Sequence, residues 1–296
     1  MSFPSPLKRK SRVTYRMHVN AEEKTALVLS AGGMFGSYQA GVWDVLSTVY
    51  QPDIVVGASV GSLNGRLIAG GCTGPELVDR WLNLHVMSEL RWRMPNSLTD
   101  GILDSSRLVD TIQEMCAGYH VQTEFGVVLT ELKRMRPTLF RAPDIRWKHI
   151  AASCSVPFIL PQYQIDGNYY TDGGLMDPLP VWAALEMGAT RIVAVNLLKT
   201  RSSWIKRLVQ GVQLWSKYSP PGAGDVEIIE ITPENPLGSA WDSMCWTSPN
   251  TSRWIDMGRT DCEAALTSVV KYGIRDNLHF VPGENSQGCP STAFTA

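Results

Sequence analysis

One stretch of this chain constrains its local structure more than any other. Residues 54–62 read Ile-Val-Val-Gly-Ala-Ser-Val-Gly-Ser, so a short apolar run leads directly into Gly-x-Ser-x-Gly, and a helical pattern follows. In this context the serine lies on a sharp strand-to-helix turn, where small neighbours allow a close approach of backbone and substrate. The following helix directs its positive end toward that serine. We therefore predict that Ser59 is a nucleophile. The alternative is a glycine-rich turn with an incidental serine.

Strand and helix patterns alternate along the chain, which indicates a mostly parallel sheet covered by helices. We expect a helix from Asp144 to Ser153, with the Asp144 carboxylate accepting from its first-turn amides. Predicted strands are Ala26–Leu29, Ile54–Val56, Val127–Leu129, Ile192–Val195 and Val226–Ile231. Further predicted helices follow the first strand and Ser59, and span Arg107–Cys116, Pro180–Met187 and Asp256–Tyr272.

We expect residues 24–296 to form a single domain, preceded by a basic tail over residues 1–23. The tail has five cations in its first 16 residues but no apolar run, so it lacks the core of a secretory signal. We expect this tail to be disordered; the alternative is that it contacts anionic lipid. No apolar stretch reaches the length of a membrane-spanning helix. These features predict a cytoplasmic protein, with peripheral membrane contact as a further possibility.

Charge and cysteine spacing exclude several classes of function. A net charge of −1 gives no reason to expect a nucleic-acid partner. The six cysteines are widely spaced without a Cys-x-x-Cys pair, and no histidine stands at ligand spacing from one of them. We therefore expect reduced thiols, no metal site and no cofactor.

A glycine-rich loop, Ser30–Gly36, directly follows the first predicted strand. Successive small residues can turn several amides toward one point and so create an anion hole. The competing interpretation is a dinucleotide-binding fingerprint, in which Ala31, Gly33 and Gly36 would occupy the three glycine positions and Asp53 would bind a ribose. Taken alone, the loop slightly favours the nucleotide interpretation, although the first glycine is missing. The Gly-x-Ser-x-Gly turn one strand later reverses this preference in favour of the anion hole.

The third motif is Ile165–Gly174, which is typical of a tight hairpin followed by an acidic residue on a glycine-rich turn. We assign Asp166 to the turn alone. A serine needs a base to become nucleophilic, and Asp172 is the candidate for that role. None of the five histidines has a local pattern that nominates it, although a Ser-His-Asp triad remains an alternative, because triad partners meet in space rather than in sequence.

These three motifs, in this order, resemble the patatin-like phospholipase family, which combines a glycine-rich oxyanion loop, a Gly-x-Ser-x-Gly turn and a late Asp-Gly-Gly or Asp-Gly-Ala turn. Residues 36–42, 151–158 and 177–181 also look like family segments, and the likeness runs from Lys24 to Leu197 and more faintly to Tyr272. The resemblance implies a three-layer α/β fold with helices on both faces of the central sheet.

The resemblance also implies a mechanism. Ser59 would attack an ester carbonyl while Asp172 takes its proton, with an acyl-enzyme as the intermediate, and the substrate would be a lipid or another ester. The amides of Gly32, Gly33 and Met34 would form the oxyanion hole. One departure is that the family loop usually reads Gly-Gly-Gly-x-Arg/Lys-Gly; this chain has alanine at position 31 in place of the first glycine, and phenylalanine at position 35 in place of the basic residue.

Two other functions are compatible with the same motifs. An acyltransferase would use an alcohol or thiol instead of water in the second step, and a non-catalytic lipid or nucleotide binder would keep the fold without the chemistry. Outside the motifs, a helical pattern over Trp204–Trp215 places Trp204, Leu208, Val212 and Trp215 on one stripe. This stripe either packs on the core or forms an interfacial lid helix.

Overall fold

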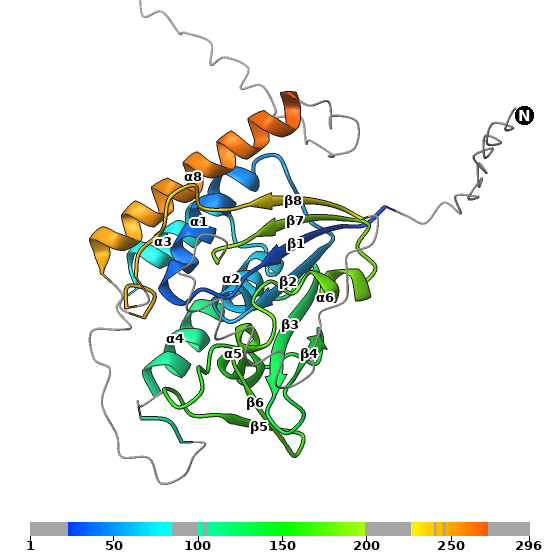
Figure 1. Cartoon of the computed structure of the whole chain (residues 1–296), viewed down its shortest axis with the longest axis vertical. Helices are drawn as coiled ribbons and strands as arrows, with labels where there is room; N and C mark the ends of the chain where they lie inside the picture. The colour runs from blue at the N-terminus through cyan, green and yellow to red at the C-terminus, as the bar shows by residue number, and fades with distance from the viewer. Residues whose placement is uncertain are drawn as a thin grey trace, which may run out of the picture.

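The described residues are organised around an eight-stranded sheet, with strand order β5-β6-β3-β2-β1-β7-β8 and β4 paired to β3 (Figure 1). Neighbours in the run β3-β2-β1-β7-β8 are parallel, whereas β4, β5 and β6 pair antiparallel. All five predicted strands are confirmed, with small shifts of their ends. The strands are β1 Thr25–Leu29, β2 Ile54–Ala58, β3 Glu124–Glu131, β4 Arg136–Arg141, β5 Tyr163–Ile165, β6 Asn168–Thr171, β7 Arg191–Val195 and β8 Glu227–Ile231.

The structure is a computed structural model, and the residues it describes are 23–84, 100–102, 106–198, 226–239, 241–244 and 247–271. Residues 1–22 of the predicted tail and the whole of Trp204–Trp215 lie outside this described part. The helices are α1 Gly36–Leu46, α2 Val60–Ala69, α3 Gly74–Leu82, α4 Ser106–Cys116, α5 Trp147–Ser153, α6 Val181–Glu186 and α8 Ser248–Lys271, with 3-10 turns η1 Gly33–Phe35 and η2 Gly173–Leu175.

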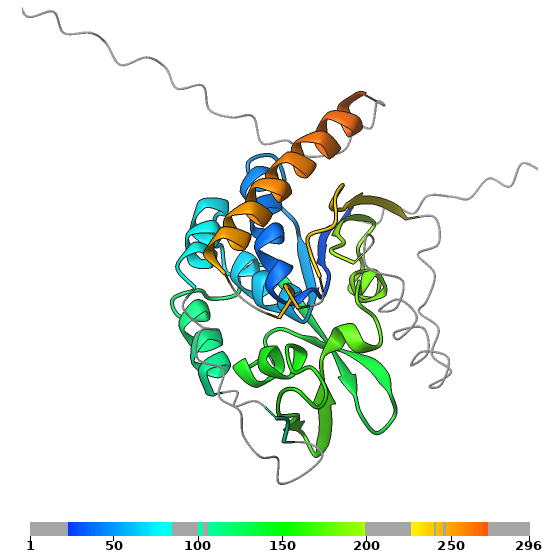
Figure 2. The same ribbon diagram turned by 60° about the vertical axis from the view of Figure 1, so that its left-hand side comes forward.

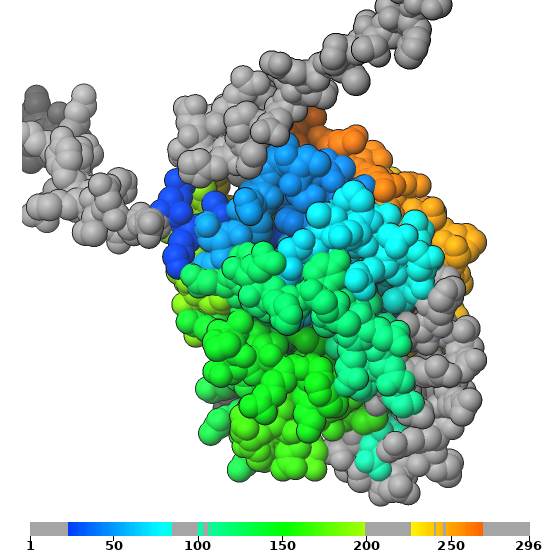
Figure 3. Space-filling model, turned by 180° about the vertical axis from the view of Figure 1, so that it is seen from behind, coloured from blue at the N-terminus to red at the C-terminus, as the bar shows by residue number. Residues whose placement is uncertain are grey.

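The two faces of the sheet carry side chains of different size. Because strand side chains alternate between faces, Leu27 and Leu29 point into a large core formed with α1, α2, α3, α4, α5 and α8. Ala26 and Val28 point to the other face, where alanines of α6 complete a smaller core. Figure 2 shows α6 on the side of the sheet away from α3 and α4, and Figure 3 shows part of the larger layer from behind. The expected three-layer α/β architecture is confirmed.

Two predicted helix starts are wrong. The helix expected from Asp144 begins at Trp147, with Arg146 as the residue before its first turn. Asp144 lies in the turn that follows β4, where its amide donates to the carbonyl of Arg141, and the capping position of the helix is Arg146, two residues further on. The last helix begins at Ser248 rather than Asp256. Pro249 is compatible with this earlier start, because the first turn of a helix does not require its amide.

Candidate active site

The strand-to-helix turn Gly57–Gly61, called the elbow below, has the predicted context. Strand β2 ends at Ala58 and α2 begins at Val60. Between them Ser59 adopts φ 53° and ψ −129°, a backbone conformation that non-glycine residues rarely occupy. Such conformations persist only where the surrounding structure enforces them, and they concentrate at functional sites. Ser59 is 6% exposed, so it is nearly buried at this turn.

Close backbone packing explains the two glycines of the elbow. A Cβ atom on Gly57 would lie 2.1 Å from the carbonyl oxygen of Gly61, and a Cβ on Gly61 would lie 2.3 Å from that of Leu29. Both distances are far below van der Waals contact with a backbone atom that cannot rotate away. Any larger residue at either position would therefore move the elbow or the end of β1.

The β5–β6 hairpin brings Asp172 to the elbow. The predicted tight turn is present: Asp166 and Gly167 both have positive φ, 47° and 82°, as a two-residue hairpin connection requires. The C-terminal end of β6 pairs with residues 130–131 of β3, and β4 pairs with the same two residues from the other edge of β3. Strand β6 therefore shares an edge of β3 with β2, which pairs with residues 124–128, nearer the start of β3. Strands β2 and β6 thus approach each other end to end, and the residue after each of them faces the same gap.

The Ser59 Oγ atom donates to Oδ2 of Asp172 at 2.6 Å, across 113 positions of sequence. The second carboxylate oxygen, Oδ1, accepts from the amide of Gly174 at 2.7 Å. The backbone of Asp172 is also bonded on both sides: its amide donates to Ser155 O at 3.0 Å, and its carbonyl accepts from Thr130 Oγ1 at 2.9 Å. The carboxylate is therefore oriented toward the serine before any substrate binds.

The glycine-rich loop Ser30–Gly36 lies beside both of these residues. Leu29, which precedes it, pairs with Gly57, and a Cβ on Gly174 would lie 2.4 Å from the Cβ of Ala31. Within the described part of the chain, the amides of Gly32 and Gly33 donate to no protein acceptor.

The third predicted donor of the oxyanion hole is already engaged. The amide of Met34 donates to the carbonyl of Ser243 at 2.8 Å. Gly33 has φ +60°, and a Cβ there would lie 2.1 Å from the same carbonyl oxygen. The segment around Ser243 therefore packs directly on this loop, which no local sequence pattern indicated.

Phe35, the residue in place of the family's usual cation, belongs to the core. Its side chain is 3% exposed and packs edge-to-face on Trp254 of α8, with ring centroids 4.9 Å apart. An apolar aromatic side chain is what this buried position accommodates, since an unpaired cation there would be costly to desolvate. Phe35 therefore anchors the end of the glycine-rich loop in the core.

Of the five histidines, the structure describes two. His149 lies in the first turn of α5, where its Nδ1 accepts from the amide of Arg146 at 3.0 Å, and its burial lowers its pKa. Its ring packs 4.7 Å from that of Phe140. His120 is an exposed residue between α4 and β3. Both therefore have structural or solvated positions, and the described residues present a Ser-Asp pair rather than a triad.

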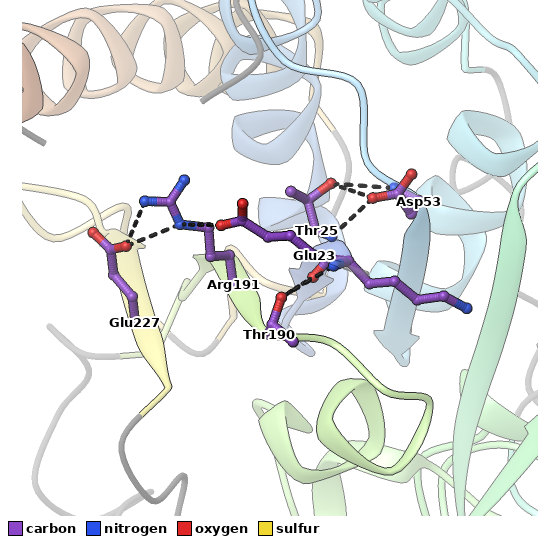
Figure 4. Close-up of polar contacts among 7 residues, drawn as sticks. Glu23, Thr25, Asp53, Thr190, Arg191 and Glu227 are labelled. Carbon is purple, nitrogen blue, oxygen red and sulfur yellow. Dashed lines mark hydrogen bonds and ion pairs between the residues drawn. The ribbon is translucent and has the colours of Figure 1, made fainter. Parts of the chain in front are cut away.

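The nucleotide alternative does not fit the position of Asp53. This residue precedes β2, and its carboxylate accepts from the amide and the hydroxyl of Thr25 at 2.8 and 2.9 Å (Figure 4). Because β1 and β2 are parallel, Asp53 lies at the opposite end of the strands from the glycine-rich loop. Five residues of strand separate the two by about 16 Å, too far for one ribose and its phosphate.

Two other kinds of site are not found among the described residues. These residues contain no cluster of three or more histidine, cysteine, aspartate or glutamate side chains arranged to bind a metal ion. No helix among them is long and apolar enough to cross a bilayer.

Known proteins resemble this chain over more than half of its length. The family profile described as patatin-like phospholipase matches residues 27–185. An uncharacterised NTE family protein of Mycobacterium bovis is 25% identical over 186 residues, covering 62% of this chain and 51% of the relative. Lysophospholipase nte1 of Aspergillus oryzae is 28% identical over 184 residues, covering 58% of this chain and 12% of the relative. This chain thus spans about half the length of the first relative and a small part of the second.

The fold has a counterpart among solved structures. VipD from Legionella pneumophila superposes with a TM-score of 0.51 at 13% identity, over 84% of this chain and 67% of that protein. At this level of identity, the likeness concerns the fold alone.

Proposed function

Because the chain belongs to the patatin-like phospholipase family, we propose that it is a serine lipid acyl hydrolase with Ser59 and Asp172 as its catalytic dyad. The observation that carries the proposal is the 2.6 Å hydrogen bond from Ser59 Oγ to Asp172 Oδ2 on a strained elbow. The relatives named lysophospholipase support a lipid ester as the substrate class. The family likeness and the dyad geometry thus support the same reaction.

The first half of the proposed reaction forms an acyl-enzyme. Asp172 accepts the Ser59 proton through Oδ2 while Oγ attacks the ester carbonyl. The amides of Gly32 and Gly33 stabilise the resulting oxyanion, a contribution of roughly 3 kcal/mol per donor in a comparable protease site. The amide of Met34 can join them only if its bond to Ser243 opens. As the tetrahedral intermediate collapses, Asp172 returns the proton to the departing alcohol oxygen.

The second half releases the fatty acid. Water attacks the acyl carbonyl, Asp172 accepts its proton, and the same amides stabilise the second oxyanion. When the bond from the carbonyl carbon to Ser59 Oγ breaks, Asp172 returns that proton to the serine. An alcohol in place of water would make the reaction an acyl transfer, so analysis of the products distinguishes the two outcomes.

Exposed aromatic side chains near the dyad support contact with a lipid surface as part of the proposal. Phe158 is 72% exposed and follows the segment whose Ser155 carbonyl accepts from Asp172. Trp241 is 72% exposed and lies two residues before Ser243, which contacts the glycine-rich loop. Tryptophan, whose ring has one polar end, is favoured at the boundary between water and lipid, and an exposed apolar ring such as that of Phe158 can enter the lipid. A cytoplasmic location with peripheral membrane contact is consistent with such a surface.

The test combines labelling with a substrate panel. A fluorophosphonate should form an adduct with Ser59, identified by peptide mass spectrometry, and chromogenic esters, phospholipids and lysophospholipids should be assayed with and without chelator. We expect labelling, release of free fatty acid and no effect of chelator. An unlabelled, inactive but folded chain would favour a lipid binder. A requirement for added calcium would contradict the metal-free mechanism.

A further inference from the structure

The last residue of α5 connects the elbow to strand β3. Ser153 is fully buried, and its hydroxyl makes two hydrogen bonds to backbone groups. It accepts from the amide of Ser59 at 2.9 Å and donates to the carbonyl of Val128 at 2.9 Å. A hydroxyl has one proton, so donation to Val128 orients its lone pairs toward the Ser59 amide. This contact spans 94 positions of sequence, and no local pattern predicted it.

The Ser59 amide depends on this acceptor. The pairing of β2 with β3 ends at Ala58 opposite Val128, one residue before the serine. Amides at the start of a helix have no partner within that helix, and Ser59 is the residue before α2. A buried amide without a partner disfavours the conformation that buries it. The Ser153 hydroxyl therefore stabilises the strained conformation at Ser59 relative to relaxed alternatives.

The same short segment also contacts the acidic partner. The carbonyl of Ser155 accepts from the amide of Asp172 at 3.0 Å and from Thr171 Oγ1 at 2.7 Å. Residues 153–155 thus contact the backbone on both sides of the Ser59–Asp172 bond. If the Ser59 backbone rotated, Oγ would move away from Oδ2 of Asp172 even though both side chains remained intact.

We propose that Ser153 is a positioning residue, which holds the strained elbow so that Ser59 Oγ stays aligned with Asp172. The inference rests on the proposed function, because alignment affects a rate only if Ser59 is the nucleophile. Ser153 acts through the Ser59 amide and touches no reacting atom. Its loss should therefore lower the reactivity of the nucleophile and leave substrate binding nearly unchanged.

Ser155 provides a matched control two residues away. Its side chain is also fully buried, and its hydroxyl also donates to a backbone carbonyl, that of Ala151 at 2.7 Å. That bond joins a residue just past the end of α5 to a carbonyl of the helix and does not involve the elbow. The Ser155 contacts to Asp172 and Thr171 use its backbone carbonyl, which replacement by alanine preserves. Both alanine variants remove a buried hydroxyl that donates to a backbone carbonyl, and only Ser153→Ala removes the acceptor of the Ser59 amide.

The experiment compares Ser153→Ala and Ser155→Ala in the full chain. Three quantities are measured: the second-order rate constant of fluorophosphonate labelling at Ser59, kcat and KM on a water-soluble p-nitrophenyl ester, and Tm. For Ser153→Ala we expect the labelling rate and kcat to fall together by about ten- to a hundredfold, with KM within about twofold of wild type. For Ser155→Ala we expect wild-type labelling and kcat.

Labelling of Ser153→Ala at the wild-type rate would overturn the inference, and so would an equal loss in Ser155→Ala. If Ser153→Ala does not fold, Ser153→Cys replaces it, because the thiol fills the site of the hydroxyl, although it is somewhat larger, and is only a weak acceptor. A folded Ser153→Cys variant that is labelled more slowly supports the inference, and one labelled at the wild-type rate overturns it. Failure of the proposed function is distinct, since wild type itself would then not be labelled at Ser59.

Discussion

The elbow and the glycine-rich loop are neighbours at the same end of the sheet, yet they are held in different ways. In the elbow, the Ser59 amide and hydroxyl both have side-chain partners, and both flanking glycines contact backbone. In the loop, the amides of Gly32 and Gly33 have no protein acceptor within the described part of the chain. Protein contacts thus hold the Ser59 oxygen in position, whereas the Gly32 and Gly33 amides of the neighbouring loop remain available to bind a ligand.

This difference fits the separate tasks that the two regions have in the proposed reaction. A nucleophile on a strained turn needs partners in the ground state, because nothing else keeps its backbone in a rare conformation. Donors that stabilise an oxyanion need to be preorganised but unoccupied until charge develops. The Met34 amide, bonded to Ser243, is the exception within the loop.

The largest effect should come from removing the attacking atom of the elbow. Ser59→Ala should abolish fluorophosphonate labelling and lower ester hydrolysis by roughly a thousandfold or more. Alanine is no larger than serine, so Tm should stay near that of wild type. Ser155→Ala, which removes an equally buried hydroxyl away from the elbow, is the control for folding. Residual turnover well above this level would identify another nucleophile.

The next effect tests the acidic partner. Asp172→Asn keeps the shape of the side chain but cannot take the proton, so kcat should fall by roughly a hundredfold or more. Asp166→Asn is the matched control, because Asp166 lies in the exposed turn of the same hairpin and asparagine tolerates its positive φ of 47°. Normal kcat for Asp172→Asn, together with loss in a histidine variant, would replace the dyad by a triad.

A third variant probes the loop rather than the elbow. Gly33→Ala should reduce kcat by roughly tenfold, because the new methyl group would displace either the loop amides or the Ser243 backbone 2.1 Å away. Gly188→Ala is the control: it also has positive φ, +96°, but its methyl group meets nothing within 4 Å. Both variants should lose about 1 kcal/mol of stability from backbone strain. Equal kcat in the two variants would show that the contact with Ser243 does not affect turnover.

The smallest effect concerns Asp177, beside the loop. Burial raises the pKa of Asp177 to about 7, and the next residue, Pro178, accepts from the Ala31 amide. The unfolded chain ionises this group near pH 4, whereas the folded protein retains the proton up to about pH 7. Stability from this group is therefore present in full below pH 4, is lost as pH rises to about 7, and is constant above that.

Asp177→Asn should flatten this dependence, because the amide mimics the protonated acid. We expect Tm of wild type to fall between pH 5 and pH 8 by more than Tm of the variant, a difference on the order of a few kcal/mol in stability. Asp166→Asn, at an exposed carboxylate, should reproduce the wild-type curve. Parallel curves for wild type and Asp177→Asn would show that Asp177 is already ionised at pH 5.

Local patterns were sufficient where neighbours in sequence decide the structure. The elbow could be predicted because a strand, a serine between glycines and a helix follow one another within a few residues. The hairpin before Asp172 could be predicted from Asp166-Gly167, which supplies both positive φ angles of its turn. Strands β1, β2, β3 and β7 could be predicted because their apolar side chains are buried on both faces, which gives short continuous apolar runs. The fifth predicted strand, β8, is only partly buried and was indicated by its isoleucines.

Tertiary structure decided what joins these pieces. Sequence motifs nominated Ser59 and Asp172, but only the end-to-end approach of β2 and β6 on one edge of β3 brings them to 2.6 Å. The hydrogen bond from Ser59 to Ser153 spans 94 positions of sequence, and that from Met34 to Ser243 spans 209. Contacts over such separations produce no local sequence pattern from which they could be predicted. Sequence by itself determined which turns this chain makes, because φ and ψ preferences are local. Only the folded sheet decided which turns face each other, because that depends on strand order and register.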